Sequence, residues 1–526
     1  MLTREDVAGA VVLMMAIFCM SAAQAGQQDK EYSPFGVMSK GEKIPRVNMH
    51  LQPEGKWKVG EDKWGKIVRV NTKKISGDDW QTVPGVEKAW PMQGYEGIEG
   101  MAFHPIISEV KDIDGDGVPE VFRCRSEHKG ARIERLSYED GSVIWESEPV
   151  GALHGDESRL PVFDLDGDGV HSVIYPTSRG TWCINAETGE TEWIAREAVG
   201  EVQIGHFLNR DEKGIVVRVG PGLATHFRGA DPPGNLGKIL CFDADGKLAW
   251  QYDTGLRGED ATNGHEMLSY DANGDGLDEV FVNWNKLTLA LGGDGSVLWK
   301  DETQQHHSDG ILCADLDADG ETEFIYDHEG CTAAQGPLYV VDAMTGEIEQ
   351  KVDYQGQGVG HAQNMAVGDF LPDRKGLELA FCGKRSNIFL FDSDGQLQWK
   401  RRAPTSLLSQ GDWDGDGAAE IMAFGIGVNV DGIFSVWNGQ GERLYAMSFL
   451  PSPSRRTWSD EHLGGSWSHA MPGGHDGIRV QRDLDGDGRA EVIMPFGSWH
   501  WGADSILFLM EKPTGQWVVG QKAGGK

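Results

Sequence analysis

Short apolar runs recur along the chain from about residue 100, and each is bounded by acidic, Gly or Asp-Gly turn residues. Runs of this kind, such as residues 388–391, predict β-strands. Their order repeats about every 50 residues as strand, acidic loop, strand, turn, strand, Asp-Gly turn and strand. Four antiparallel strands repeated eight times predict an all-β fold, a β-propeller of eight four-stranded blades. A β-solenoid of the same period is the alternative, although its coils would not need four hairpin strands each.

The repeats end in a Gly-x-x-x-Trp pattern or in a weaker version of it. We interpret these tryptophans as packing between blades, because an indole buries a large apolar area. The full pattern joins Gly141 to Trp145, Gly189 to Trp193, Gly246 to Trp250, Gly295 to Trp299 and Gly395 to Trp399. The weaker closures are Gly346 to Gln350, Gly441 to Tyr445 and Gly515 to Trp517.

The acidic loop is clearest at residues 483–491, where Asp occupies positions 1, 3 and 5 and Glu occupies position 9. Its glycines permit a sharp turn that gathers these oxygens, and the carbonyl of position 7 can add another. Hard oxygen ligands around one small volume suit Ca²⁺. An EF-hand has its glutamate at position 12 and helical flanks, whereas apolar strands flank this loop. We therefore expect calcium loops between the first and second strands of the blades.

Six loops follow this spacing, and two of them are degraded. Ser172 replaces the glutamate in the second repeat, and Asn273 replaces an aspartate in the fourth. The third and sixth repeats lack the ligand spacing, although residues 368–378 keep a turn. The predicted calcium ligands are Asp112, Asp114, Asp116 and Glu120; Asp164, Asp166 and Asp168; Asp271, Asn273, Asp275 and Glu279; Asp315, Asp317, Asp319 and Glu323; Asp412, Asp414, Asp416 and Glu420; and Asp483, Asp485, Asp487 and Glu491.

The N-terminal end differs from the repeats. Residues 7–20 are apolar and residues 23–25 form an Ala-Gln-Ala cleavage site, which predicts a signal peptide at 1–25 and a secreted or periplasmic protein. Glu5 and Asp6 offset the charge of Arg4. Residues 26–99 read as an extension with a strand at 66–70, and residues 100–526 form the propeller. No later stretch is apolar enough to span a bilayer, and we expect a monomer.

The formal net charge of −34 argues against a nucleic-acid partner. Much of this charge belongs to the predicted calcium loops, where bound Ca²⁺ would offset it, so the charge does not exclude an acidic polysaccharide. The seven cysteines show no C-x-x-C spacing, and the sequence leaves both buried thiols and disulfides open.

Histidines recur at one register before the loops. His307, His361 and His475 each stand eight residues before a first loop position, and His154 and His265 stand near the same register. Eight extended residues span roughly 26 Å, so we expect these histidines on the face opposite the calcium loops. The turns between second and third strands share that face and contain basic residues: Lys129, Arg179, Lys286, Lys384 and Arg385. This face suits an anionic ligand.

Aromatic residues gather near the C-terminal end of the chain. Trp467 and His475 lie in the long break at 448–478, and Trp499 and Trp501 follow in the next turn. Exposed aromatic rings beside polar groups can stack on sugar faces. The alternative is a packed cap over the central channel.

The chain resembles the family 11 rhamnogalacturonan lyases over about residues 100–520. The resemblance rests on the Asp-x-Asp-Gly-Asp-Gly loops, on Gly360-His361 leading into residues 368–378, and on the Gly-x-x-x-Trp endings. It implies a secreted eight-bladed calcium propeller that cleaves pectin backbones. The chain is also similar to FG-GAP and VCBS repeat proteins, which share the loops and are often non-catalytic. The long β-sandwich extension of the lyases is not evident, and the resemblance matches no catalytic residue individually.

A lyase of this kind removes the C5 proton of a uronic acid by β-elimination. It needs a cation near the carboxylate, a base that reaches C5 and an acid that reaches the leaving oxygen. Our candidates for base and acid are His154, His265, His307 and His361, with Arg179 and Arg385 as neutralising cations. Candidate substrate-binding residues are Lys384, His475, Trp467, Trp499 and Trp501. A non-catalytic binding propeller remains the alternative. A third function, a quinone-dependent dehydrogenase, is suggested only by the Trp-ended blades.

Overall fold

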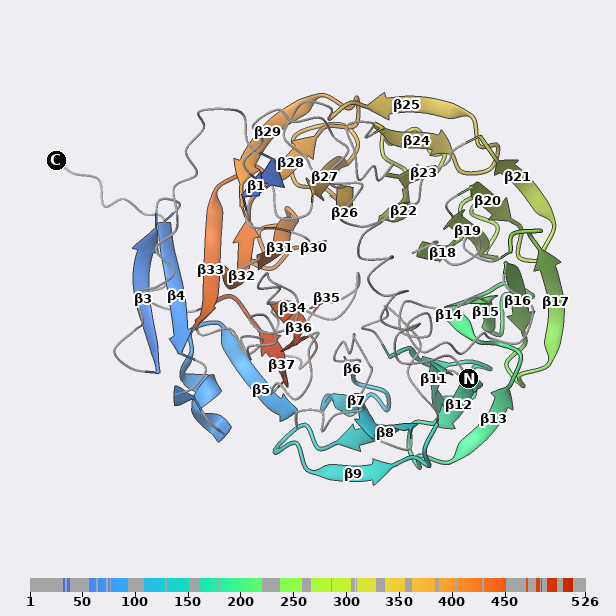
Figure 1. Cartoon of the computed structure of the whole chain (residues 1–526), viewed down its shortest axis with the longest axis horizontal. Helices are drawn as coiled ribbons and strands as arrows, with labels where there is room; N and C mark the ends of the chain where they lie inside the picture. The colour runs from blue at the N-terminus through green and yellow to red at the C-terminus, as the bar shows by residue number, and fades with distance from the viewer. Residues whose placement is uncertain are drawn as a thin grey trace, which may run out of the picture.

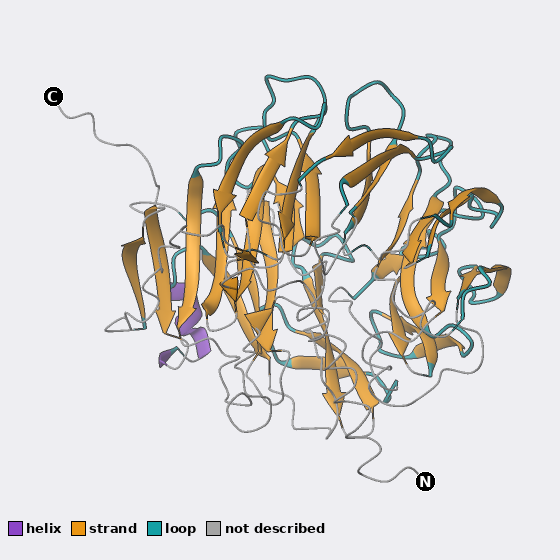
Figure 2. Ribbon diagram, turned by 45° about the horizontal axis from the view of Figure 1, so that its top comes forward, coloured by secondary structure: helices purple, strands orange, loops and turns teal. Residues whose placement is uncertain are grey.

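A computed structural model of the protein describes residues 32–33, 36–37, 56–62, 65–71, 74–75, 77–92, 108–127, 130–150, 160–177, 179–219, 237–257, 266–284, 286–303, 308, 310–327, 336–354, 362–383, 387–403, 405, 407–427, 430–450, 470–471, 479–482, 484, 490–498 and 505–513. Eight antiparallel sheets built on four strands each stand around a ring (Figure 1). The predicted eight-bladed β-propeller is confirmed. Strands dominate the described residues, which also include the 3₁₀ helix η2 (Gly77–Thr82) (Figure 2).

Blades one to seven follow the chain in order, each running from the innermost to the outermost strand. Blades one to four are β6 (Ser108–Lys111), β7 (Glu120–Glu127), β8 (Gly130–Leu136) and β9 (Val143–Glu146); β10 (Val162–Asp164), β11 (His171–Thr177), β12 (Gly180–Asn185) and β13 (Thr191–Ala195); β14 (Gly200–Gly205), β15 (Gly214–Val219), β16 (Lys238–Phe242) and β17 (Leu248–Asp253); and β18 (Glu266–Tyr270), β19 (Glu279–Trp284), β20 (Leu287–Leu291) and β21 (Val297–Asp301). Blades five to seven are β22 (Ile311–Ala314), β23 (Glu323–Tyr326), β24 (Leu338–Asp342) and β25 (Ile348–Val352); β26 (Ala362–Gly368), β27 (Glu378–Gly383), β28 (Asn387–Phe391) and β29 (Leu397–Arg402); and β30 (Leu407–Gly411), β31 (Glu420–Gly427), β32 (Val430–Trp437) and β33 (Arg443–Leu450).

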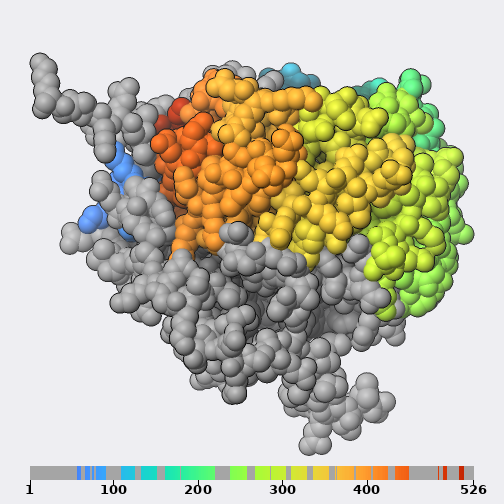
Figure 3. Space-filling view, turned by 90° about the horizontal axis from the view of Figure 1, so that it is seen from above, coloured from blue at the N-terminus to red at the C-terminus, as the bar shows by residue number. Residues whose placement is uncertain are grey.

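The core lies between neighbouring blades. In blade four, every residue of β19 and β20 is buried, whereas the residues of β21 are exposed or half-buried. Middle strands are covered on both faces by the adjacent blades, which explains why their sequences are continuously apolar instead of alternating. Between blades three and four, for example, Val216 and Ile239 pack in one cluster with Val280 and Leu289. Seen from above, the later blades follow one another around the rim (Figure 3).

Blade eight combines the two ends of the chain. Its strands are β35 (Arg479–Arg482), β36 (Ala490–Ser498), β37 (Ser505–Met510) and, at the outer edge, β5 (Val86–Met92), which pairs antiparallel with β37. The short β34 (Ala470–Met471) also pairs with β36. The segment expected as an N-terminal extension therefore supplies the outermost strand of the last blade. The closure expected at Gly515 and Trp517 lies outside the described residues.

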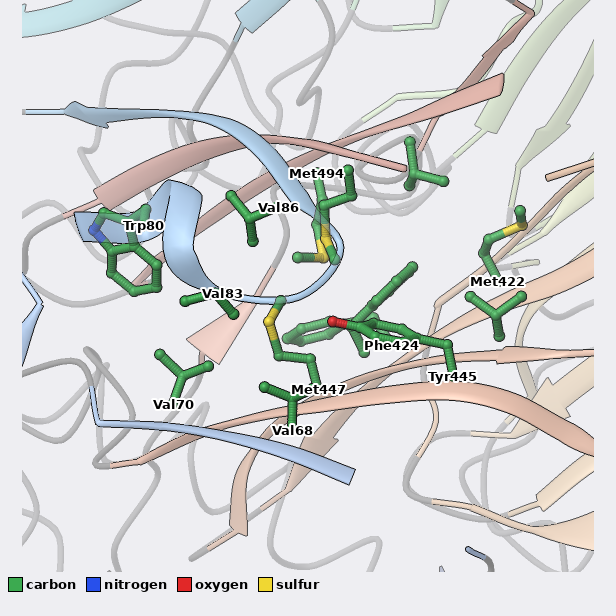
Figure 4. Close-up of a cluster of buried hydrophobic side chains, with 14 of the residues drawn as sticks. Val68, Val70, Trp80, Val83, Val86, Met422, Phe424, Tyr445, Met447 and Met494 are labelled. Carbon is green, nitrogen blue, oxygen red and sulfur yellow. The ribbon is translucent and has the colours of Figure 1, made fainter. Parts of the chain in front are cut away.

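Two more strands of the N-terminal segment extend blade seven. β3 (Trp57–Asp62) pairs with β4 (Gly65–Asn71), and β4 runs parallel to β33. β4 contains the strand predicted at residues 66–70. Side chains from β4 and the η2 region pack with blades seven and eight in one buried cluster (Figure 4). Its labelled members are Val68, Val70, Trp80, Val83, Val86, Met422, Phe424, Tyr445, Met447 and Met494. The small pair β1 (Tyr32–Ser33) and β2 (Gly36–Val37) is separate from these sheets.

Candidate functional site

The acidic loops connect the first and second strands of blades one, two, four, five, seven and eight, as predicted. In each of the first five of these blades, the carboxylate of position 1 accepts hydrogen bonds from backbone N–H groups later in the loop. Asp112 accepts one from Gly115 at 2.7 Å and one from Gly117 at 3.0 Å. The corresponding acceptors in the other loops are Asp164, Asp271, Asp315 and Asp412. These contacts fold the loop around its first aspartate.

The glutamate at position 9 lies at the N-terminal end of the second strand and is buried, at 7 % exposure or less in each case. Its carboxylate accepts a hydrogen bond from the N–H of position 2. The donor and acceptor pairs are Ile113 with Glu120, Ala272 with Glu279, Leu316 with Glu323, Trp413 with Glu420 and Leu484 with Glu491. Leu371 and Glu378 make the same contact in blade six, which lacks the aspartate spacing. The glutamate therefore has a structural role that does not require the full set of aspartates.

The geometry of the loops fits a divalent cation. Carboxylate oxygens lie within 4.8 Å of one another in four of them, at Asp112, Asp114 and Glu120; at Asp164, Asp166 and Asp168; at Asp315, Asp317, Asp319 and Glu323; and at Asp412, Asp414 and Glu420. The donors are all oxygens, which Ca²⁺ prefers. Asp414 Oδ1 is buried without a hydrogen-bond partner.

Electrostatics in the loops favour the same cation. Burial, reinforced by the nearby carboxylates, raises the pKa of Glu323 to about 7 and that of Glu420 to about 8. A bound cation would relieve the cost of keeping these buried groups ionised.

The two degraded loops differ in their side-chain contacts. In blade four, the Asn273 Nδ2 group donates to Glu279 Oε1 at 2.9 Å. In blade two, the Ser172 hydroxyl donates to Glu192 Oε2 at 2.7 Å, so a carboxylate from β13 lies beside the position where the other loops have their glutamate. Sequence reasoning missed Glu192, because it follows the loop by a whole hairpin. In blade eight, Asp483, Asp485 and Asp487 lie outside the described residues.

In blade one, an arginine side chain lies beside the acidic loop. Arg135 Nη2 lies 2.8 Å from Glu120 Oε1, so both oxygens of this glutamate have partners in the protein.

On the opposite face, Arg179 falls within the described residues. It lies in the turn between β11 and β12, at the far end of β11 from the acidic loop, and it is exposed. Its N–H donates to the Thr177 hydroxyl at 3.0 Å. Lys286 is exposed in the equivalent turn of blade four. The other predicted catalytic and substrate-binding residues lie outside the described residues: His154, His265, His307, His361, Lys384, Arg385, Trp467, His475, Trp499 and Trp501.

The same end of the propeller contains a charged cluster between blades three and four that sequence reasoning missed. Arg218 Nη2 lies 2.5 Å from Glu201 Oε2, and Glu201 Oε1 accepts the N–H of Met267 at 2.9 Å. The Arg218 guanidinium lies 5.6 Å from the ring centroid of Trp284. The cluster joins two innermost strands near the face where the histidines are predicted. The available signal was an arginine within the apolar strand β15.

No family model matches the chain. It is 26% identical over 389 residues to the rhamnogalacturonan exolyase YesX of Bacillus subtilis (strain 168), a match that covers 60% of this chain and 59% of the relative. The chain thus spans about three fifths of the length of the curated relative that it matches. The resemblance to rhamnogalacturonan lyases therefore holds at low identity. No helix among the described residues is long and apolar enough to cross a membrane.

Solved structures give a similar result. The rhamnogalacturonan lyase YesW superposes with a TM-score of 0.51 at 19% identity, covering 80% of this chain and 75% of that one. The exotype rhamnogalacturonan lyase YesX gives 0.52 at 20% identity with the same coverage. Sqt1 of Saccharomyces cerevisiae gives 0.51 at 10% identity, covering 80% and 100%. These likenesses show a shared propeller fold.

Proposed function

We propose that this protein is a polysaccharide lyase that cleaves an acidic polysaccharide of the rhamnogalacturonan class by β-elimination. The observation that supports this most directly is the sequence similarity to a rhamnogalacturonan exolyase over 389 residues. The exposed basic turns of Arg179 and Lys286, on the face opposite the acidic loops, add a surface suited to uronate carboxylates. Secretion follows from the proposed signal peptide at residues 1–25.

The proposed reaction needs three groups at one sugar. A base removes the C5 proton, the C4–O bond breaks as a C4=C5 double bond forms, and an acid protonates the leaving oxygen. We assign base and acid among His154, His265, His307 and His361, because the side chain of an unperturbed histidine titrates close to neutral pH. Arg179 and Arg385 would neutralise the carboxylate and stabilise the charge that develops on it. Lys384, His475, Trp467, Trp499 and Trp501 would bind flanking sugars.

Calcium has a structural role in this proposal. The loops lie at the far ends of the strands from the basic turns, so ions held there stabilise blades without touching the substrate. Each loop would supply carboxylates from positions 1, 3, 5 and 9, with Asn273 and Ser172 weakening two sites.

The test is to incubate the purified protein with rhamnogalacturonan, unbranched pectin and ulvan. The expected result is ultraviolet absorbance from the unsaturated uronate in rhamnogalacturonan, and less or none in the other two polymers. Arg179→Gln should lower the rate, whereas Lys247→Gln, in an exposed turn at the outer edge of blade three, serves as the matched control. Saturable binding of rhamnogalacturonan without unsaturated product would favour a non-catalytic binding propeller and reject the lyase.

A further inference from the structure

The loops of blades five and seven have the same four ligand residues but opposite surroundings. The blade-five loop has three more carboxylates in it or beside it, Glu321 at position 7, Asp342 and Glu349, whose oxygens are within 4.8 Å of one another. Beside the blade-seven loop lies a lysine instead. Lys512 Nζ is 3.0 Å from Oδ2 of Asp414, the residue at position 3. Identical donor sets thus face different local charge.

The position of Lys512 is determined by closure of the ring. It stands two residues after the end of β37, and the N–H of the intervening Glu511 donates to the Gly85 carbonyl at 3.0 Å. On its other side, Pro513 packs so closely on Gly85 that a Cβ built there would be 3.2 Å from the proline Cγ. The backbone on both sides of Lys512 is therefore tied to the start of β5. The ammonium group reaches the blade-seven loop from this anchored segment.

We propose that Lys512 is a built-in counter-ion of the blade-seven loop and competes with Ca²⁺ for Asp414, so that this loop binds calcium more weakly than the blade-five loop. The inference rests on the proposed calcium role of the loops. Ca²⁺ lies about 2.3–2.6 Å from its ligand oxygens, so an ion bound to Asp414 would stand a few ångströms from the ammonium. The Asp414 side chain is 17% exposed, so solvent screens this repulsion incompletely.

The metal-free protein gains from the same contact. Lys512 offsets one carboxylate of a crowded acidic group and links the C-terminal segment to blade seven. Calcium would replace that link with its own bonds to the loop. Removing the lysine should therefore lower stability without calcium and enlarge the stabilisation that calcium adds.

Trp413 allows binding to this loop to be measured separately. It occupies position 2 of the blade-seven loop, where the blade-five loop has Leu316. Tb³⁺ has oxygen preferences like those of Ca²⁺, and tryptophan excitation sensitises its luminescence only at short range. The part of the Tb³⁺ signal that Trp413→Phe removes reports the blade-seven loop. Displacement of that signal by Ca²⁺ gives the calcium affinity, and calorimetry of the parent against Asp317→Asn gives the affinity of blade five.

In the full chain, Lys512→Met should raise the calcium affinity of the blade-seven loop about fivefold, at the upper end of what an exposed ion pair contributes. Lys512→Arg should keep the affinity low. Lys300→Met is the matched control and should leave the affinity unchanged. Lys300 lies on β21, the outer strand of blade four, and its Nζ is 2.7 Å from Oε1 of Glu302, which follows that strand.

An unchanged or lower affinity in a folded Lys512→Met protein overturns the inference. If that variant does not fold, the inference is tested with Lys512→Gln and with the salt dependence of calcium binding by the parent protein. Added salt should weaken calcium binding less at the blade-seven loop than at the blade-five loop. Equal salt dependence would count against Lys512. Absence of binding at both loops would reject the calcium role itself, whereas binding at blade five with no effect of Lys512 would reject this inference alone.

Discussion

Trp90 lies against Gly141, so that a Cβ built on the glycine would be 3.2 Å from the indole Cδ1. Its indole N–H donates to the Tyr138 carbonyl at 3.2 Å. Trp90 belongs to β5 at the outer edge of blade eight, and Gly141 precedes β9 of blade one. The contact therefore joins the last blade to the first.

The same relationship recurs at the other blade boundaries. The predicted packing role is confirmed for the five tryptophans of the full Gly-x-x-x-Trp pattern, and Gln350 and Tyr445 take the equivalent places in two blades. The remaining pairs are Trp145 on Gly189, Trp193 on Gly246, Trp250 on Gly295, Trp299 on Gly346, Gln350 on Gly395, Trp399 on Gly441 and Tyr445 on Gly85. The ring is closed by the same kind of contact that joins its interior blades.

Gly189→Ala should destabilise the protein by about 2 kcal/mol or more, because a Cβ there would be 2.6 Å from Trp145 Cε3. Gly255→Ala is the matched control: its φ of +79° is close to the +76° of Gly189, but nothing lies within 4 Å of the added Cβ. Urea unfolding of both variants separates backbone strain from blade packing. Equal losses would show that the contact with Trp145 contributes nothing.

Calcium removal should lower the melting temperature. A ligand that binds the folded state alone stabilises it by about 2.7 kcal/mol per site at one hundred times its Kd. We expect excess EGTA to lower the melting temperature in a fluorimetric scan and added Ca²⁺ to restore it. Asp317→Asn should reduce this calcium effect more than Asn273→Ala, because the blade-four loop already lacks one charge. A melting temperature indifferent to EGTA would contradict structural calcium.

The Glu378→Gln variant should become more stable relative to the parent protein as pH rises. Burial raises the pKa of Glu378, although its hydrogen bond from Leu371 opposes this. A carboxyl with a raised folded-state pKa stabilises most below its unfolded pKa, and that contribution is lost as pH rises through the folded value. Glutamine keeps an acceptor for Leu371 without titrating. Between about pH 5 and pH 8, the unfolding free energy of the variant should increase relative to that of the parent. Glu187 is an exposed turn residue, so Glu187→Gln is the control. An equal increase in its relative stability with pH would show that burial of Glu378 is not the cause of the effect.

The described cysteines should be unreactive in the folded protein. Cys124, Cys183, Cys241, Cys313 and Cys382 are free thiols, which resolves the choice left open by the sequence for these five residues. Burial raises the pKa of Cys124 and Cys241 to about 12 and raises that of the other three as well. Because the thiolate is the reactive form, DTNB should label these residues only after unfolding. Cys331→Ser in a chain from residue 26 isolates them, and rapid labelling of that folded variant would be the contrary result.

His361→Ala should cut turnover at least about tenfold if the proposed lyase uses this residue, since general acid–base groups typically contribute 10²–10⁴. His361 stands at the shared register of the predicted ligand face, after a glycine-rich approach. The melting temperature should stay within about a degree of the parent, as for other exposed substitutions. Full activity, or a loss of several kcal/mol in stability, would assign the residue to structure.

The sequence by itself determined the features that depend on near neighbours. Strand identity follows from local apolar runs, and each acidic loop gathers Asp112 and Glu120, or their equivalents, within nine residues of chain. The turn that places Arg179 opposite the loop is equally local, because an antiparallel hairpin must reverse at the far end of its strand. Repetition of these local signals was enough to predict the blades, and it favoured eight of them without excluding seven.

Only the tertiary structure decided how distant segments meet. The pairing of β5 with β37, the parallel contact of β4 with β33, and the approach of Lys512 to Asp414 have no periodic signal in the sequence. Each of these contacts joins segments that are far apart in the chain. Which segments pair depends on which strand edge is still unpaired once the ring has formed. An unpaired edge strand leaves N–H and C=O groups without partners, so the last blade accepts the strand that arrives there. In this protein that strand comes from the other end of the chain.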